Sequence, residues 1–331
     1  MPQCEIGIYN FPMPPRATDS DSRLSHRIKL RDLQILFTVV ELGSMAKAAS
    51  HLAVTQPTVS EAIAALEDVV GVRLLDRSPH GVVPTIYGQT FLRRGLEAFD
   101  ALKQGMRDVE FQATHGAGDV WIGSSEVLLG GFVPAIIQRL ARSHPNIVVH
   151  ATEVNPSDLD FKKLRDRKLD LMLGMLRTSQ IDDDLTTEKL FEESVSIVVG
   201  ASSRWANRRK VALSDLMDEP WILGDPNNAT QMAVSAAFRA AGLTLPRIGA
   251  VTQSMNLRMA LLASGNYVSA VPNSLLQYSA SRWGLKTLPV TLGVRYPVGI
   301  LTLKNRTLSP VSEIFMENAR SIAASLLSPV G

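Results

Sequence analysis

Residues 31–70 hold three helical periodicities separated by very short connections, and this arrangement restricts the fold more than any other feature. The first periodicity places apolar side chains on one face between residues 31 and 41, and Gly43 then supplies a flexible break. Ser44 is a good N-cap for a short second helix, whose Ala48 and Ala49 let another helix approach closely. The apolar positions of the first helix are Leu33, Leu36, Phe37 and Val40.

The third helix follows a turn at residues 53–55. Thr55 can cap it, Pro57 suits its first turn because no N–H is needed there, and Gly71 is well placed to end it. Its buried stripe is Val59, Ile63, Leu66 and Val70. Three short helices joined in this way predict a helix-turn-helix.

The exposed start of the third helix carries short polar side chains, namely Gln56, Thr58, Ser60 and Glu61. A DNA-reading helix places this end in the major groove. Gln can pair with adenine, Ser and Thr can contact bases or phosphates, and the methyl group of Thr58 can touch thymine. A solvated helix face has the same composition, so both interpretations stay open on these residues alone.

Residues 74–85 read as two short extended pieces around Gly81, which predicts a hairpin wing. The cations nearest the predicted groove are Arg73, Arg77 and His80. The planar guanidinium of Arg77 could hold a phosphate, and pairing of Arg77 with Asp76 or Glu67 is the competing interpretation.

A long helix capped by Thr85 is expected next. Its apolar residues recur at intervals of three and four, at Leu92, Leu96, Phe99, Leu102, Met106 and Val109. A narrow apolar seam on a lone helix requires a partner.

Charge gives little support to nucleic-acid binding. The net charge is +2, and residues 27–112 carry ten basic and ten acidic side chains, so DNA affinity must come from the placement of a few cations. The single cysteine, Cys4, excludes a disulfide framework within the chain and fits a reducing, cytoplasmic setting. Residues 1–27 lack the apolar core of a signal peptide and are expected to be a disordered leader, and no apolar run predicts a membrane span.

Together these motifs resemble the N-terminal domain of bacterial LysR-type transcription regulators. The matching stretches are residues 44–49 (SMAKAA), 55–60 (TQPTVS), 66–67 (LE), 71 (G), 74–77 (LLDR) and 84–88 (PTxxG). The chain departs from the family pattern at Leu75, where Phe is usual, and at Glu61, where Arg or Gln often follows the serine.

The resemblance implies a winged helix-turn-helix over residues 28–85 and a linker helix over residues 86–113 that pairs with its copy in a second subunit. It further implies double-stranded promoter DNA, RNA polymerase and a small-molecule effector as partners, a homodimer or homotetramer, no cofactor and no membrane. The third helix would enter the major groove and the wing would contact the DNA backbone. The DNA-contacting positions would be Ser44, Thr55, Gln56, Pro57, Thr58, Ser60, Glu61, Arg73, Arg77 and His80.

From residue 119 short apolar runs alternate with helical segments, which predicts an α/β domain with a mainly parallel sheet. Separate strands are expected, among others, at 195–199 and 298–303. The family resemblance implies that residues 118–331 form two lobes, as in type II periplasmic binding proteins. Lobe 1 would comprise about 118–195 and 296–331, lobe 2 about 196–295, and two crossings of the chain would make a hinged cleft.

Ligands of open α/β sheets bind at the carboxyl ends of strands, near helix N-termini. This rule, which agrees with where LysR-type sensors bind effectors, selects Ser124, Ser125, Glu126, Val127, Asn155, Pro226, Asn227, Asn228, Thr252 and Gln253. Helix capping by Ser125 and Asn228, with turn chemistry elsewhere, is the alternative interpretation.

Glu126 bears on the chemistry of the effector, because a carboxylate at a helix N-terminus occupies the place that an anion would take. If Glu126 points into the cleft, a neutral polyol, a sugar-like ligand or a cation is favoured. If it points outward, an organic acid remains possible.

Other chemistries find little support in the sequence. It has no G-x-S-x-G elbow, no Walker loop and no pair of histidines at metal-ligand spacing, so an enzyme is not expected. The acidic run at residues 182–184 could be a cation site but is more simply a solvated loop. A solute-binding transport component would share the C-terminal fold but has no use for residues 31–112.

Overall fold

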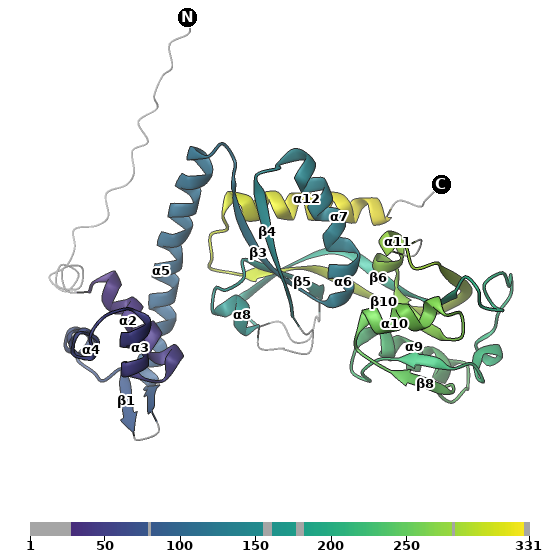
Figure 1. Cartoon of the computed structure of the whole chain (residues 1–331), viewed down its shortest axis with the longest axis horizontal. Coiled ribbons are helices and arrows are strands. Elements are labelled where there is room, and N and C mark those ends of the chain that lie inside the picture. The colour runs from purple at the N-terminus through teal and green to yellow at the C-terminus, as the bar shows by residue number, and fades with distance from the viewer. Residues whose placement is uncertain (1–27, 79–80, 155–160, 177–181, 280–281, 328–331) are drawn as a thin grey trace, which may run out of the picture. The chain divides into compact units, whose positions relative to one another are not determined.

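The computed structural model describes residues 28–78, 81–154, 161–176, 182–279 and 282–327, shown in colour in Figure 1. Contacts divide the chain into two compact units, residues 1–100 and 101–331. His80, Asn155 and the leader at residues 1–27 lie outside the described residues.

The first unit packs short helices and a two-stranded hairpin around one apolar core. Its elements are α2 (Leu30–Leu42), α3 (Met45–His51), α4 (Gln56–Val70), β1 (Leu75–Ser78), β2 (Gly81–Pro84) and the start of α5 (Ile86–Ala113). Ser44 caps α3 by accepting from the Lys47 N–H at 3.4 Å, and Thr55 caps α4 by accepting from the Thr58 N–H at 3.3 Å. Gly43 and Gly71 end α2 and α4 in the left-handed conformation, so the predicted helix boundaries are confirmed.

The hairpin is fixed to the rest of this unit by backbone contacts. The Val82 N–H donates to the Gly43 carbonyl at 2.9 Å, and a Cβ on Gly81 would lie 2.8 Å from the same oxygen. A Cβ on Gly88, in the first turn of α5, would lie 2.0 Å from the Leu74 carbonyl oxygen. Both glycines are therefore required by close approach of two backbones, which fixes the direction of the wing and of the linker helix.

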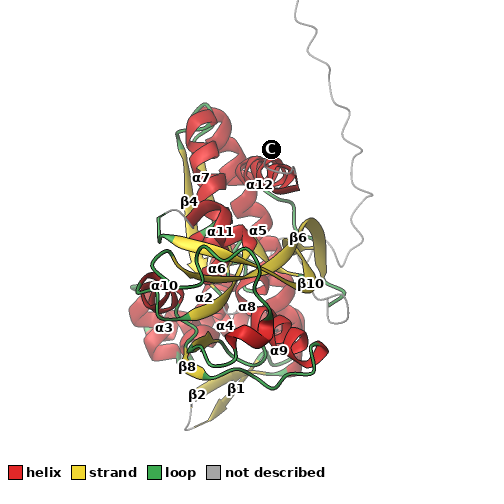
Figure 2. Ribbon diagram, turned by 90° about the vertical axis from the view of Figure 1, so that its right-hand side faces the viewer, coloured by secondary structure: helices red, strands yellow, loops and turns green. Residues whose placement is uncertain are grey.

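The second unit is built on a continuous eight-stranded sheet with the order β4-β3-β5-β10-β6-β9-β7-β8 (Figures 1 and 2). Its strands are β3 (Gly118–Ser124), β4 (Ile147–Glu153), β5 (Leu171–Met175), β6 (Leu185–Gly200), β7 (Trp221–Leu223), β8 (Ile248–Val251), β9 (Val268–Pro272) and β10 (Leu285–Leu303). Its helices are α6 (Glu126–Gly130), α7 (Phe132–Ser143), α8 (Lys162–Arg165), α9 (Ala229–Ala240), α10 (Met255–Ala263), α11 (Asn273–Ser279) and α12 (Pro310–Leu327), with a 3₁₀ turn, η1, at Leu213–Leu216.

Two strands of this sheet are much longer than the sequence predicts. The runs at 195–199 and 298–303 are not separate strands but parts of β6 and β10, which have 16 and 19 residues. β10 runs antiparallel to both β5 and β6, and β6 runs antiparallel to β9, so the expected mainly parallel sheet is a mixed one. Polar residues such as Glu192, Glu193 and Ser194 interrupt the apolar runs, which hides the continuity of the strands from a periodicity search.

β6 and β10 carry the chain between two lobes, each with its own core. One apolar cluster lies around Phe132 and Phe315, and a second around Trp221 and Phe238. The two-lobed α/β fold is confirmed, while the exact limits of the lobes stay predictions.

The crossing contains a buried carboxylate, Glu193, with 2% of its surface exposed. Its Oε1 accepts from the backbone N–H groups of Ser194 at 3.1 Å and Ser274 at 3.2 Å, and its Oε2 has no partner among the described residues. Burial raises the pKa of Glu193 above its ordinary 4.5, and Glu193 in turn helps to raise the pKa of Tyr296.

We predict that Glu193→Gln alters the dependence of stability on pH. The folded state holds the Glu193 proton more tightly than the unfolded state, so the wild type loses stability as the pH rises from below 4.5 through the raised pKa. The variant lacks this loss, so it should gain stability relative to the wild type over that interval. Urea unfolding at a series of pH values tests this, and parallel curves for the two proteins would contradict it.

Candidate functional site

The N-terminal end of α4 presents a small polar surface held by an ordered cap. Gln56 and Glu61 are exposed, whereas Thr58 and Ser60 are half-buried. The Thr58 hydroxyl lies 2.8 Å from that of Thr55, and the Ser60 hydroxyl donates to the Met45 sulfur at 3.5 Å. Gln56 is therefore exposed at the first position of α4, and Pro57 beside it is also exposed.

The wing supplies two exposed cations, Arg73 and Arg77. Glu67, one suggested partner of Arg77, instead accepts from the N–H groups of Leu74 at 2.7 Å and Leu75 at 3.1 Å. No ion pair joins Arg77 to another residue in the described part of the chain. The guanidinium of Arg77 is therefore available to an external anion.

In lobe 1 the predicted cleft residues end β3 and begin α6. Ser124 is wholly buried and its hydroxyl donates to the Leu173 carbonyl at 3.1 Å, which leaves it no exposed surface for a ligand. Ser125 precedes α6 without a side-chain capping bond, so the capping interpretation is wrong for this residue. Val127 packs against an apolar cluster of lobe 2.

Glu126 points across to lobe 2. Its two carboxylate oxygens each lie 3.0 Å from the backbone nitrogen of Met255, the first residue of α10, whose N–H they accept. The sequence left the direction of Glu126 open, and the structure turns it toward the opposite lobe.

In lobe 2 the predicted residues surround the starts of α9 and α10. Asn228 caps α9 by accepting from the Gln231 N–H at 2.7 Å, so the capping interpretation is confirmed for Asn228. Gln253 donates to Asp225 at 3.2 Å, and Thr252 accepts from the Ser254 N–H at 3.0 Å. Pro226 and Asn227 are exposed in the turn before Asn228.

Arg258 lies beneath this surface and was not selected from the sequence. Its guanidinium donates to the carbonyls of Ile222, Leu223 and Thr252 and to the Ser269 hydroxyl, at 2.6–3.1 Å. Burial lowers the pKa of Arg258 to about 10, with Glu126 opposing the shift, so the side chain stays charged at neutral pH. An arginine inside a helical periodicity carries no sequence signal that marks it as buried.

A pocket of about 20 Å³ lies between the start of α9 and Arg258, lined in part by Gly224, Asn228, Thr230 and Gln231. This volume holds no more than about one water, whereas small-molecule sites usually measure about 300–1,000 Å³. Of the predicted effector positions only Asn228 lines it, and all of its lining residues belong to lobe 2.

Asp170 joins the end of the linker helix to lobe 1. It is 2% exposed and pairs with Arg306 at 2.9 Å and with Arg107 of α5 at 3.3 Å, and it accepts from the Trp121 N–H at 2.9 Å. Arg107 also lies 4.4 Å above the Trp121 ring, whose other neighbour is a parallel His150 ring at 4.6 Å. The sequence analysis selected none of these residues, because they come from distant segments.

We predict unequal effects of removing the two cations around Asp170. Arg306→Ala leaves a buried carboxylate poorly compensated and should lower stability by about 3–5 kcal/mol. Arg107→Ala, in which the lost side chain is partly exposed, should lower it by about 1 kcal/mol or less. Urea unfolding followed by tryptophan fluorescence compares them, and equal losses would refute the assignment of Arg306 as the main partner.

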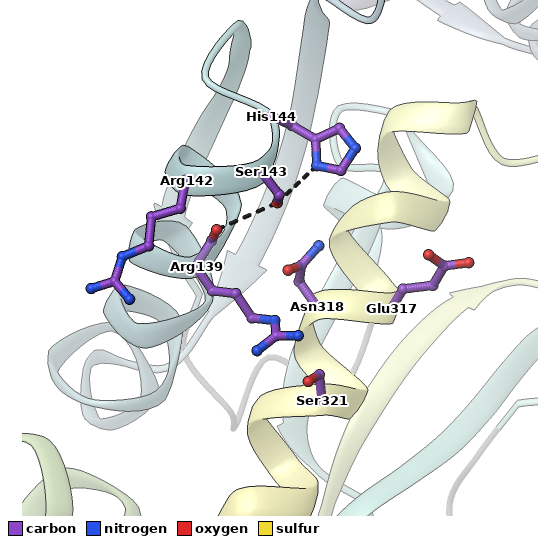
Figure 3. Close-up of a pocket in the computed structure, with 7 residues that line it drawn as sticks. All are labelled: Arg139, Arg142, Ser143, His144, Glu317, Asn318 and Ser321. Atoms are coloured by element: carbon purple, nitrogen blue, oxygen red, sulfur yellow. Dashed lines mark hydrogen bonds between the residues drawn. The ribbon is translucent and has the colours of Figure 1, made fainter.

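A second hollow lies on lobe 1 between α7 and α12. Figure 3 shows Arg139, Arg142 and His144 on one side of it and Glu317, Asn318 and Ser321 on the other, around a volume of about 470 Å³. It contains none of the predicted positions, and both charge signs face it.

The acidic run at residues 182–184 is paired with an arginine. Arg165 pairs with Asp182 and Asp184 and holds the pKa of Asp184 below its ordinary value. Within the described ranges no cluster of three or more metal-ligating side chains occurs, and no helix is long and apolar enough to cross a membrane.

Comparison with known proteins agrees with this arrangement of two units. Residues 30–89 match the model of the bacterial regulatory helix-turn-helix protein, lysR family, and residues 113–324 match the LysR substrate binding domain. The chain belongs to the LysR family. It is a LysR-type DNA-binding transcription regulator with an effector-binding domain.

Relatives of this LysR-type regulator match over most of their length. The transcriptional regulator GbpR of Azospirillum brasilense is 27% identical over 300 residues, covering 90% of this chain and 87% of GbpR. Full-length OxyR from Pseudomonas aeruginosa has a TM-score of 0.62 at 22% identity, covering 90% of this chain and 97% of OxyR. Full-length CbnR complexed with its target DNA has a TM-score of 0.51 at 23% identity, covering 89% of this chain and 100% of CbnR. At these identities the two structures show a shared fold.

Proposed function

We propose that this LysR-type regulator binds promoter DNA as a homodimer, with the start of α4 in the major groove, and that a small effector in the cleft between the lobes controls that binding. The observation that carries the proposal is the exposed, capped N-terminal end of α4 beside an unpaired Arg77. Groove-facing polar side chains give sequence preference, and cations near the groove hold phosphates. The proposed DNA surface comprises Ser44, Thr55, Gln56, Pro57, Thr58, Ser60, Glu61, Arg73, Arg77 and His80.

The second half of α5 supports the homodimer. Leu102, Met106 and Val109 are 51%, 75% and 66% exposed, and their spacing of four and three places them on one side of the helix. Large apolar side chains in such a row are costly in water and are covered by a second helix in coiled coils. A second copy of α5 would cover them and set two α4 helices against two half-sites of DNA.

The effector-binding part of the proposal rests on the two lobes and the two strands that connect them. The carboxyl ends of β3 and β7 both lead to helix N-termini, α6 in lobe 1 and α9 in lobe 2. The effector would contact Ser125, Glu126, Asn228, Thr252 and Gln253, and need no further cofactor. A homotetramer, contact with RNA polymerase and a cytoplasmic location remain predictions.

We predict that Gln56→Ala reduces the preference of the protein for its own promoter site by about 1–3 kcal/mol, because a side chain that reads a base is lost. Arg77→Ala should weaken binding to all DNA roughly equally, because phosphates carry no sequence information. Fluorescence anisotropy with promoter and scrambled duplexes at matched salt measures both. A Gln56→Ala protein with unchanged preference would count against the assignment of α4 as the reading helix.

We also predict that Met106→Glu makes the protein monomeric at micromolar concentration, because it places a charge in the middle of the apolar row. Val83→Glu, at a 59% exposed valine on the wing, is the matched control and should leave the assembly unchanged. Light scattering gives the mass. A monomeric wild type, or a dimer that survives Met106→Glu, would overturn the proposed interface.

A further inference from the structure

We infer that Glu126 is a built-in anion of the effector cleft, which caps α10 from the opposite lobe and restricts the effector to uncharged or cationic compounds. This inference rests on the proposed function of the cleft and specifies its ligand class.

The first argument is geometric. The N-terminal N–H of a helix is a donor without an intrahelical partner, and the partial positive charge at this end attracts anions. At α10 the N–H of Met255 has both oxygens of Glu126 at 3.0 Å, and the N–H of Leu257 donates to Ser254 at 3.3 Å. The place that an anionic ligand would take is filled by a side chain of lobe 1.

The second argument concerns the only buried cation at this end of the pocket among the described residues. The two terminal nitrogens of Arg258 donate to three carbonyls and one hydroxyl, so their hydrogens are used within lobe 2. An incoming carboxylate would find no bidentate partner there, although such pairing is what makes arginine effective in binding anions. Arg258 instead orders the strand ends and balances the charge of Glu126.

The third argument is the balance of charge around the starts of α9 and α10, outside the small pocket. Glu126 and Asp225 contribute two negative charges against the single positive charge of Arg258, and the oxygens of Asp225 accept from Asn227 N–H and Gln253. An anion would enter against this excess, at a cost that increases with burial. Hydroxyl or ammonium groups could instead donate to Glu126 once the lobes part.

The contact also joins the two lobes. Glu126 lies on lobe 1 and Met255 on lobe 2, so their hydrogen bond holds the lobes together without an effector.

Hydrogen exchange on the full-length protein tests the inference. In Glu126→Ala the first turn of α10, residues 254–257, should exchange roughly tenfold faster than in the wild type, because a charge-assisted hydrogen bond is lost. Added sulfate or acetate, at constant ionic strength, should slow exchange there again in the variant and have no effect in the wild type. Glu126→Ser, which removes the charge and is too short to fill the place at the start of α10, should show the same response to sulfate if Glu126→Ala folds poorly.

Asp225→Asn is the matched control, since it removes the other negative charge counted above, which contacts Asn227 and Gln253 and not α10. It should leave exchange at residues 254–257 unchanged. Slowing by sulfate in the wild type, or unchanged exchange in both Glu126 variants, would overturn the inference. DNA binding by the same proteins is measured separately, so a loss of promoter binding would speak against the proposed function and not against the cap.

Discussion

The pairing of β6 with β10 is the interaction on which the effector-binding unit depends. These two antiparallel strands continue through both lobes, with register shifts near Thr287, Thr291 and Val298. Each lobe adds its own strands to them, so the core of one lobe and the core of the other share the same backbone ladder. The buried Glu193 lies on β6 at this crossing.

Two polar contacts join distant parts of this unit. Glu126 holds the open edge of the cleft by capping a helix of the other lobe, and Asp170 holds the linker helix against lobe 1 through Arg107 and Arg306. Each is a carboxylate that satisfies backbone or guanidinium donors from distant parts of the chain.

The sequence predicted much of the DNA-binding unit, because its signals are local. Ser44, Thr55, Gly43 and Gly71 lie at the helix ends that their chemistry favours, and the helix periodicities are regular. For the effector-binding unit the sequence predicted the class of fold. It predicted only short parts of β6 and β10, however, and a mainly parallel sheet. Strand pairing depends on partners a hundred residues away, which local periodicity does not encode.

The sequence by itself determined the family, the order of helices, the apolar row on α5 and the polar start of α4, since each follows from the spacing of neighbouring residues. Only the tertiary structure decided which of the proposed site residues face one another. It buried Ser124, committed Asn228 to a helix cap, brought Arg258 under the pocket and directed Glu126 to α10. The contact of Glu126 depends on how the two lobes meet, whereas burial and hydrogen bonding within one lobe place Ser124, Asn228 and Arg258.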